Sequence, residues 1–366
     1  MSESLRGLLA RHVTAGTMPG AVGVFGDDEP FAVGRDGPDG AALRPDAVFR
    51  IQSMTKVVTA AATLRLVQDG ALGLDDPVAT WLPELSAPRV LPHPDAPLQE
   101  ARPARRPITL RHLLTNTSGY GMMTTDSPLR AAMAAAALEA GAEPVPLGAQ
   151  EWLDALAALP LAFEPGEGWR YHHSFGLLGI LLGRVDAGST EEVLRTTVLD
   201  PAGMTDTGFR VRAGEEHRLV AAYRHRPEGL VPTEPAGAGF FVAPPYDVSH
   251  SELISTAADF HAFLRALWDG RLIDDALVHE LRRDQVPASA KADDSFFPGF
   301  WHDTGWGYGV SVVTGGPHRG RFGWSGGLGT DFFVDADGTS CIVMTQVEMD
   351  DRVFGMLGEL QDVTSR

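Results

Sequence analysis

The sequence predicts an α+β fold in which an antiparallel sheet, flanked by terminal helices, takes strands from both ends of the chain. Short apolar runs with strand character lie near the N-terminus, and runs of period two return from Trp306 onward. Between them, residues 60–200 carry apolar side chains at helical spacing. Because the two sets of strands must pair across a helical stretch, we expect a sheet domain of residues 1–60 and 250–366 and an inserted, mainly helical domain of residues 61–249.

The N-terminal part should form one helix and three strands. Residues 3–15 are predicted to be an amphipathic helix, because Leu5, Leu9 and Val13 recur at helical spacing. The strands expected after it are residues 21–25, 30–33 and 47–51.

The middle of the chain is predicted to be mostly helical. A long apolar helix begins near Ser53 and stops at Asp69-Gly70, and a proline-rich surface loop covers residues 86–107. Thr109 is the expected N-cap of a short helix. Further helices are expected at residues 108–114, 129–140, 148–158, around 177–182 and at 191–198, followed by irregular structure or short strands over 206–250.

The C-terminal part returns to strands. Thr256 is the expected N-cap of a helix that runs through Leu267. The strands expected after it are residues 306–313, 319–325, 328–335 and 339–347, followed by a final helix over 351–361.

Composition excludes several classes of protein. A hydrophobic content of 44% and a charged content of 21% are typical of a globular protein. The net charge of −18 disfavours nucleic acid and anionic membrane as partners. Cys341 has no second cysteine to pair with and is expected to be a core residue. The N-terminus lacks the pattern of a signal peptide and no apolar run is long enough to span a bilayer, so we expect a cytoplasmic protein.

The strongest chemical signal is the pair Ser53 and Lys56. On a helix, two residues three apart lie on one face, one turn from each other. A serine hydroxyl becomes a good nucleophile when a neighbouring base takes its proton. A lysine buried in an apolar helix loses hydration, which favours its neutral form, and a neutral amine is such a base. The spacing therefore suggests a nucleophile and its base, although Ser53 also fits a simple helix N-cap.

Two further stretches complete the chemistry of acyl transfer. Tyr171 precedes a helix, and a phenol beside an ammonium group has its ionised form favoured, which would make it a second proton shuttle. The simpler reading makes Tyr171 a core or surface ring. The glycine-rich stretch 322–330 lies between two expected strands, and its glycines let a ligand approach the backbone. The backbone N–H groups of Gly327 and Ser53 are the expected oxyanion hole.

The order of these three stretches resembles the serine β-lactamase and penicillin-binding-protein superfamily, in particular its class C branch with the family VIII carboxylesterases. Four other stretches are similar as well: residues 108–119, 163–166, 201–207 and 253–260. The resemblance implies a β-lactamase/transpeptidase-like fold with Ser53 as the acylated nucleophile and Lys56 as its base or electrostatic partner. It also implies that Tyr171 is the shuttle to the leaving group.

The same resemblance implies a substrate-binding set of His173, Trp324, Ser325 and Gly326. His173 stands where the family usually has an asparagine, whose amide both donates and accepts hydrogen bonds. Trp324 stands where β-lactamases and peptidases usually have a lysine that holds the substrate carboxylate. Both departures argue against β-lactam and D-alanyl-D-alanine substrates, and favour a carboxylic ester with a neutral, partly apolar acyl group.

Several alternatives remain open at this stage. The run Gly323–Gly327 fits the G-x-S-x-G elbow of α/β-hydrolases with Ser325 as nucleophile, but a strand is expected after it and the last histidine is His318. The 12 histidines include no H-E-x-x-H motif, so a metallohydrolase has little support. An acyltransferase, a β-lactamase, a D-amino-acid peptidase and a non-catalytic binding relative stay possible. We expect no metal, no cofactor and a small-molecule acyl substrate as partner; the oligomeric state is left open.

Overall fold

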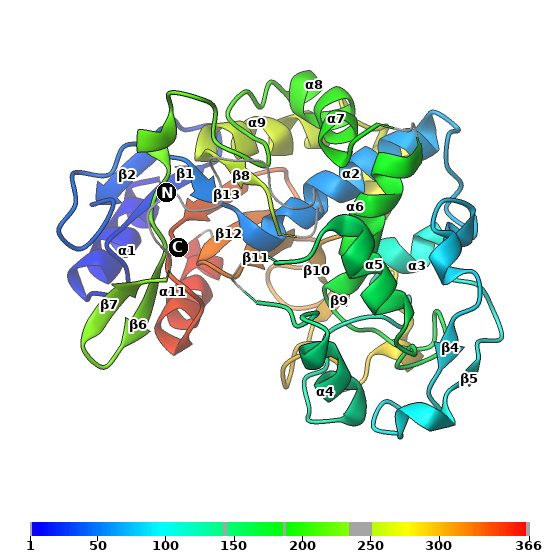
Figure 1. Cartoon of the computed structure of the whole chain (residues 1–366). Coiled ribbons are helices and arrows are strands. Elements are labelled where there is room, and N and C mark those ends of the chain that lie inside the picture. The colour runs from blue at the N-terminus through cyan, green and yellow to red at the C-terminus, as the bar shows by residue number, and fades with distance from the viewer. Residues whose placement is uncertain (1, 142–144, 186–187, 234–250, 364–366) are drawn as a thin grey trace.

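The computed structural model describes residues 2–141, 145–185, 188–233 and 251–363. It confirms the α+β fold. A seven-stranded antiparallel sheet has the order β2-β1-β13-β12-β11-β10-β9, so N-terminal strands lie beside C-terminal ones (Figure 1). The strands of this sheet are β1 (Gly20–Phe25), β2 (Phe31–Gly34), β9 (Thr304–Trp306), β10 (Ser311–Val313), β11 (Phe322–Gly326), β12 (Thr330–Val334) and β13 (Ser340–Met344).

The two terminal helices cover one face of the sheet. These are α1 (Ser2–Thr14) and α11 (Asp351–Gln361). Leu5 of α1 and Met356 of α11 join Phe333 of the sheet in one buried apolar cluster. On the opposite face, the ring of Phe260 in α9 (Ala257–Trp268) lies 5.1 Å from that of Phe332. Neighbouring residues of β12 therefore point to opposite faces, as the pleat of a strand requires.

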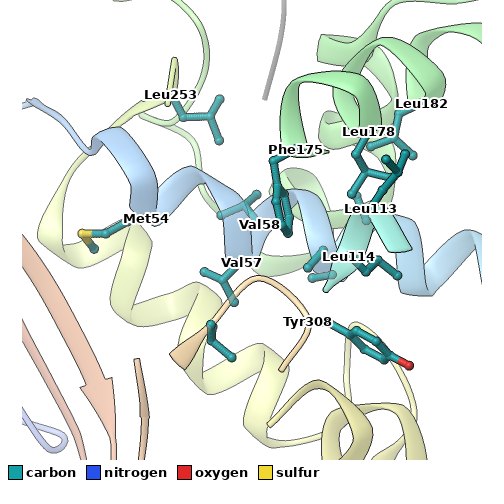
Figure 2. Packing of buried hydrophobic residues seen from close by; sticks show 14 of the residues in the cluster. Met54, Val57, Val58, Leu113, Leu114, Phe175, Leu178, Leu182, Leu253 and Tyr308 are labelled. Atoms are coloured by element: carbon teal, nitrogen blue, oxygen red, sulfur yellow. The ribbon is translucent and has the colours of Figure 1, made fainter. Parts of the chain in front are cut away.

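Helix α2 (Thr55–Gln68) runs through the middle of the molecule and packs against α6 and α7 (Figure 1). Val57 and Val58 of α2 belong to the main apolar core with Phe175, Leu178 and Leu113 from other helices (Figure 2). The other helices are α3 (Leu110–Leu114), α4 (Pro128–Ala135), α5 (Ala149–Ala157), α6 (His173–Val185), α7 (Thr190–Leu194), α8 (Asp200–Ala202) and α10 (Asp275–Leu281). Because α2 is apolar nearly all round, it can be enclosed on every side.

Both predicted N-caps are confirmed. The side chain of Thr109 accepts a hydrogen bond from the His112 backbone N–H, and Thr256 accepts one from the Asp259 N–H at 3.1 Å. Each threonine satisfies a backbone donor that has no partner within its helix.

Among the described residues, three short two-stranded pairs lie outside the main sheet. Two of the strands predicted from the sequence differ from those observed. The pairs are β3 (Phe49–Arg50) with β8 (Ile254–Ser255), β4 (Arg89–Val90) with β5 (Arg102–Pro103), and β6 (Tyr223–Arg226) with β7 (Gly229–Pro232). The strand predicted at 47–51 is thus only two residues long and pairs with β8. The strand predicted at 306–313 is two strands, because Gly309 has φ +78° and the chain turns back there.

Other boundaries shift modestly. The helix predicted at 129–140 ends at Ala135, and the stretch 191–198 includes a π-helical turn, Arg195–Leu199. Helix α10 is not anticipated from the sequence. The predicted irregular stretch includes residues 234–250, which lie outside the described residues. The expected domain boundary near 249 falls in the same gap, and the domain division therefore stays a prediction. Across the described ranges, no helix has both the length and the apolar character of a membrane span.

Candidate active site

Ser53 and Lys56 lie together at the start of α2. Ser53 is the middle residue of a 3₁₀ turn, Gln52–Met54, that leads directly into the helix. The Lys56 Nζ atom donates a hydrogen bond to the Ser53 Oγ atom at 3.0 Å. The alternative reading of Ser53 as a helix N-cap is wrong, because Met54 holds the N-cap position of α2 and no side chain caps it.

The burial of Lys56 decides its chemistry. Its side chain is fully enclosed, and this desolvation lowers the pKa of Lys56 to about 7, with the Glu252 carboxylate acting in the opposite direction. A large fraction of the amine is therefore neutral near pH 7. A neutral amine at hydrogen-bond distance can take the Ser53 proton.

Tyr171 is the third member of the predicted set, and the structure brings it to Ser53. It lies just before α6, its side chain hydrogen-bonds that of Ser53, and its hydroxyl accepts a bond from the Trp324 Nε1–H at 2.5 Å. The Lys56 Nζ atom lies over the ring, 4.6 Å from its centroid.

The protonation state expected for Tyr171 is wrong. Burial raises the pKa of Tyr171 above its usual value of 10.0, although its hydrogen bonds with Ser53 and Trp324 act in the opposite direction. The nearby lysine is itself desolvated, so it does not provide the fixed positive charge that the sequence argument assumed. A neutral amine beside a neutral phenol avoids the cost of burying two charges.

The backbone next to both groups is strained. Gln52, which precedes Ser53, has φ +49°, and His172, which follows Tyr171, has φ +92°. Residues with a side chain rarely adopt such angles, and they persist where the surrounding structure enforces them, often at functional sites.

The β11–β12 hairpin packs directly on the turn that carries Ser53. The Thr330 hydroxyl donates to the Ile51 carbonyl at 3.1 Å, and any side chain on Gly326 would collide with that same carbonyl. Gly327 consequently lies beside Gln52, the residue before Ser53. The hairpin end and the turn that carries Ser53 thus meet backbone to backbone at Ile51 and Gly326. The oxyanion hole formed by the N–H groups of Ser53 and Gly327 stays a prediction.

His173 does not line the site. The residue is 1% exposed, its Nε2 atom is hydrogen-bonded to the Leu138 carbonyl at 2.6 Å, and its ring stacks on that of Trp152. Burial lowers the pKa of His173 to about 4, so the ring is neutral. A substrate could contact this ring only if the ring left its contacts with Leu138 and Trp152. The substrate-binding role predicted for His173 is therefore not supported.

Trp324 and Ser325 are adjacent in β11 and have different surroundings. The Trp324 ring lies 5.2 Å from that of Tyr171, whereas the Ser325 hydroxyl donates to the buried Asp331 carboxylate at 2.5 Å. Desolvation raises the pKa of Asp331 to about 7. The α/β-hydrolase alternative is wrong, because Ser325 lies within a strand, is followed by another strand, and has a carboxylate as its partner.

An aromatic shell around Tyr171 was not anticipated. The rings of Phe296, Trp306 and Trp324 lie 5.1, 5.8 and 5.2 Å from that of Tyr171. Trp169 also stacks on Tyr171 at 6.0 Å. The signal available in the sequence is the density of Phe and Trp in residues 296–306, which carries no spacing rule of its own.

A sequence profile described as Beta-lactamase matches residues 5–353. The chain belongs to the β-lactamase family. It is 36% identical to an uncharacterised protein of Mycobacterium tuberculosis (strain CDC 1551 / Oshkosh), over 83% of this chain and 76% of that protein. It is 31% identical to Esterase EstB of Burkholderia gladioli, over 88% of this chain and 82% of that protein.

Solved structures confirm the β-lactamase/transpeptidase-like fold. EstCE1, described as a hydrolase with promiscuous acyltransferase activity, superposes with a TM-score of 0.80 at 23% identity, over 98% of this chain and 97% of that one. A simvastatin synthase from Aspergillus terreus superposes with a TM-score of 0.80 at 21% identity, over 98% of this chain and 96% of that one. At these identities the likeness concerns the fold.

The lowered pKa of Lys56 predicts a pH dependence of the reaction that Ser53 supports. Because the neutral amine is the reactive form, kcat/KM should rise as the pH increases through about 7 and then level off. The measurement is kcat/KM for p-nitrophenyl acetate from mildly acidic to mildly alkaline pH. Asp331→Asn removes another group whose pKa lies near 7 and should retain the rise. A flat profile in the unaltered protein would contradict the role of Lys56.

Proposed function

We propose that this chain is a serine hydrolase that cleaves small carboxylic esters through a covalent acyl-enzyme on Ser53. The observation that carries the proposal is the hydrogen bond that the fully buried Lys56 amine donates to Ser53. The Tyr171 phenol is hydrogen-bonded to the same serine. Nucleophile, base and proton donor thus share one enclosed space, which is the arrangement that acyl transfer needs.

The reaction follows from these contacts. Neutral Lys56 takes the Ser53 proton as the Oγ atom attacks the ester carbonyl, and the N–H groups of Ser53 and Gly327 stabilise the oxyanion. When the carbonyl reforms, the bond to the alcohol breaks and Tyr171 gives its proton to the departing oxygen. The Lys56 ammonium then returns a proton to Tyr171. Water then attacks the acyl-enzyme. Tyr171 takes a proton from the water as it passes its own proton to Lys56. The Lys56 ammonium finally returns a proton to the Ser53 oxygen as the acid is released.

Trp324 supports an ester rather than a β-lactam as substrate. Its Nε1–H is directed at the Tyr171 oxygen, and it supplies no cation for a substrate carboxylate. Relatives point the same way: besides the Burkholderia gladioli esterase, a lovastatin esterase of Penicillium rubens is 29% identical over 81% of this chain.

Acyl transfer to an acceptor other than water is the second candidate. The acyl-enzyme would be the same and only the attacking group would differ. An acyltransferase of Penicillium decumbens is 30% identical over 69% of this chain and 60% of that protein, which favours this alternative. The release of free acid in the presence and absence of added alcohols separates the two. The cytoplasmic location stays a prediction from the sequence.

Ser53 should be the only serine that reacts with a fluorophosphonate probe, because it alone among the candidates contacts a neutral amine. Peptide mass spectrometry after labelling should place the adduct on Ser53. Ser53→Ala should abolish labelling, whereas Ser325→Ala should retain it. An adduct on Ser325 would refute the proposal.

Tyr171→Phe should lower kcat for p-nitrophenyl acetate by at least about 10²-fold, the low end for loss of a general acid–base group. The matched control is Tyr223→Phe, which also removes one phenol hydroxyl but lies in the β6–β7 hairpin. Steady-state kinetics of both variants provide the comparison. If Tyr171→Phe retains its turnover, Tyr171 has no role as a shuttle.

Short p-nitrophenyl esters should be hydrolysed at least about 10²-fold faster than a chromogenic cephalosporin, measured as kcat/KM, because no cation at position 324 holds the substrate carboxylate. Both substrates can be followed by absorbance with one enzyme preparation. Comparable values for the two would show that Trp324 does not set the substrate class.

A further inference from the structure

A cavity of about 380 Å³ lies between the C-terminal end of α10 and the β10–β11 hairpin. His279, Arg282 and Arg283 contribute to its lining from the helix and the residues directly after it, and Arg319 contributes from the hairpin turn. None of the described residues that line this cavity belongs to the catalytic set, so the cavity is separate from the active site.

Two charged groups of the lining are already paired. Arg283 donates to the Glu280 carboxylate through Nε at 3.0 Å and through Nη2 at 2.5 Å. Asp284, the one carboxylate in the described lining, pairs with Lys291 and accepts the backbone N–H of Trp306 at 3.1 Å. These pairs contribute little net charge to the cavity, because each cation has a carboxylate beside it.

The other two arginines of the lining, Arg282 and Arg319, have no carboxylate partner in the part of the chain that the structure describes. The Arg282 Nε atom is enclosed without a hydrogen-bond partner among those residues, and the guanidinium carbon lies 4.7 Å from the centre of the Trp268 ring. Stacking on the indole holds this guanidinium in place, so less conformational entropy is lost when it binds a ligand.

Two guanidinium groups that line one cavity repel each other. A cation beside the last turn of a helix is stabilised by the helix dipole, which accounts for Arg282 after α10 but not for Arg319 in a hairpin turn. An anion between the two groups would remove their repulsion and accept charge-assisted hydrogen bonds from both. The planar fork of N–H donors on arginine matches the oxygens of phosphate and carboxylate groups.

A phosphate group fits the charge of this cavity better than a carboxylate group does. At pH 7 a phosphate monoester carries roughly 1.5 to 2 negative charges, which balance both guanidinium groups, whereas a carboxylate balances only one. The Thr314 side chain also lines the cavity and adds a hydroxyl donor for a further phosphate oxygen.

We propose that this cavity binds a phosphate group, either as free phosphate or as part of an organic phosphate. The proposal goes beyond ester hydrolysis and does not depend on the chemistry of Ser53. Arg282 and Arg319 hold the phosphate oxygens, and Val312 and Val313 of β10 offer apolar contact to an organic part. The net charge of −18 repels anions from the chain as a whole, so saturable binding of phosphate reports a local site.

Calorimetric titration of the unaltered protein with inorganic phosphate near pH 7 should show saturable binding at one site. Arg282→Gln and Arg319→Gln should each weaken this binding at least about tenfold, because each removes a charged donor. The matched control is Arg352→Gln, which removes the same charge at an exposed position of α11 and should leave the affinity as it is. Arg319 is exposed in a turn, so its variant tests the proposal even if Arg282→Gln does not fold.

Two further ligands test the chemistry of the site in the same titration. Acetate should bind at least about tenfold more weakly than phosphate, because it balances only one guanidinium group. Tighter binding of phenyl phosphate than of inorganic phosphate would identify an organic phosphate as the ligand, and equal or weaker binding would identify free phosphate.

Absence of saturable phosphate binding would overturn the proposal. Equal weakening in Arg319→Gln and Arg352→Gln, or acetate that binds as tightly as phosphate, would overturn it as well. Ser53→Ala should bind phosphate as the unaltered protein does, because the catalytic groups do not line the cavity. The outcome for the phosphate site is therefore independent of the outcome for the esterase function.

Discussion

The enclosure of one amine inside the protein is the constraint on which the rest of the site depends. Lys56 sits in the first turn of a helix that is surrounded by other elements, and its pKa is lowered because no water reaches it. A more exposed lysine at the same spacing would remain an ammonium group at neutral pH and could not take a proton from Ser53. The apolar packing of α2 against α3 and α6 therefore contributes to chemistry as much as to stability (Figure 2).

The second requirement is the contact between the Ser53 turn and the β11–β12 hairpin. Gly326 allows two backbones to approach where any side chain would collide, and Thr330 ties the hairpin to the Ile51 carbonyl. The strained backbone angles at Gln52 and His172 are consistent with this close contact, because Gln52 directly precedes Ser53 and His172 directly follows Tyr171. Preorganised donors of this kind stabilise a developing charge without moving during the reaction.

Much of the fold and the pairing of Ser53 with Lys56 could be predicted from the sequence. The wrong predictions concern how individual side chains are oriented and buried. A spacing of three on a helix determines that Ser53 and Lys56 meet, and alternation predicted strands β11, β12 and β13 nearly in place. His173 was assigned by analogy with the asparagine of a motif, yet one residue into a helix turns the side chain toward the core. The ionised Tyr171 was wrong because burial, which the motif does not encode, outweighs a nearby amine. The aromatic shell and Asp331 come from distant segments and follow no periodic pattern.

The pairing of the first strand with the last has a consequence for biosynthesis. Val22 in β1 pairs with Met344 in β13, so the nascent chain cannot complete its sheet until nearly all of it has left the ribosome. Contacts so distant along the chain are slow to form, and β1 remains without this neighbour until β13 has been synthesised. Ser53 and the β11–β12 hairpin that packs on its turn are likewise far apart along the chain, so their contact forms only after both have been synthesised.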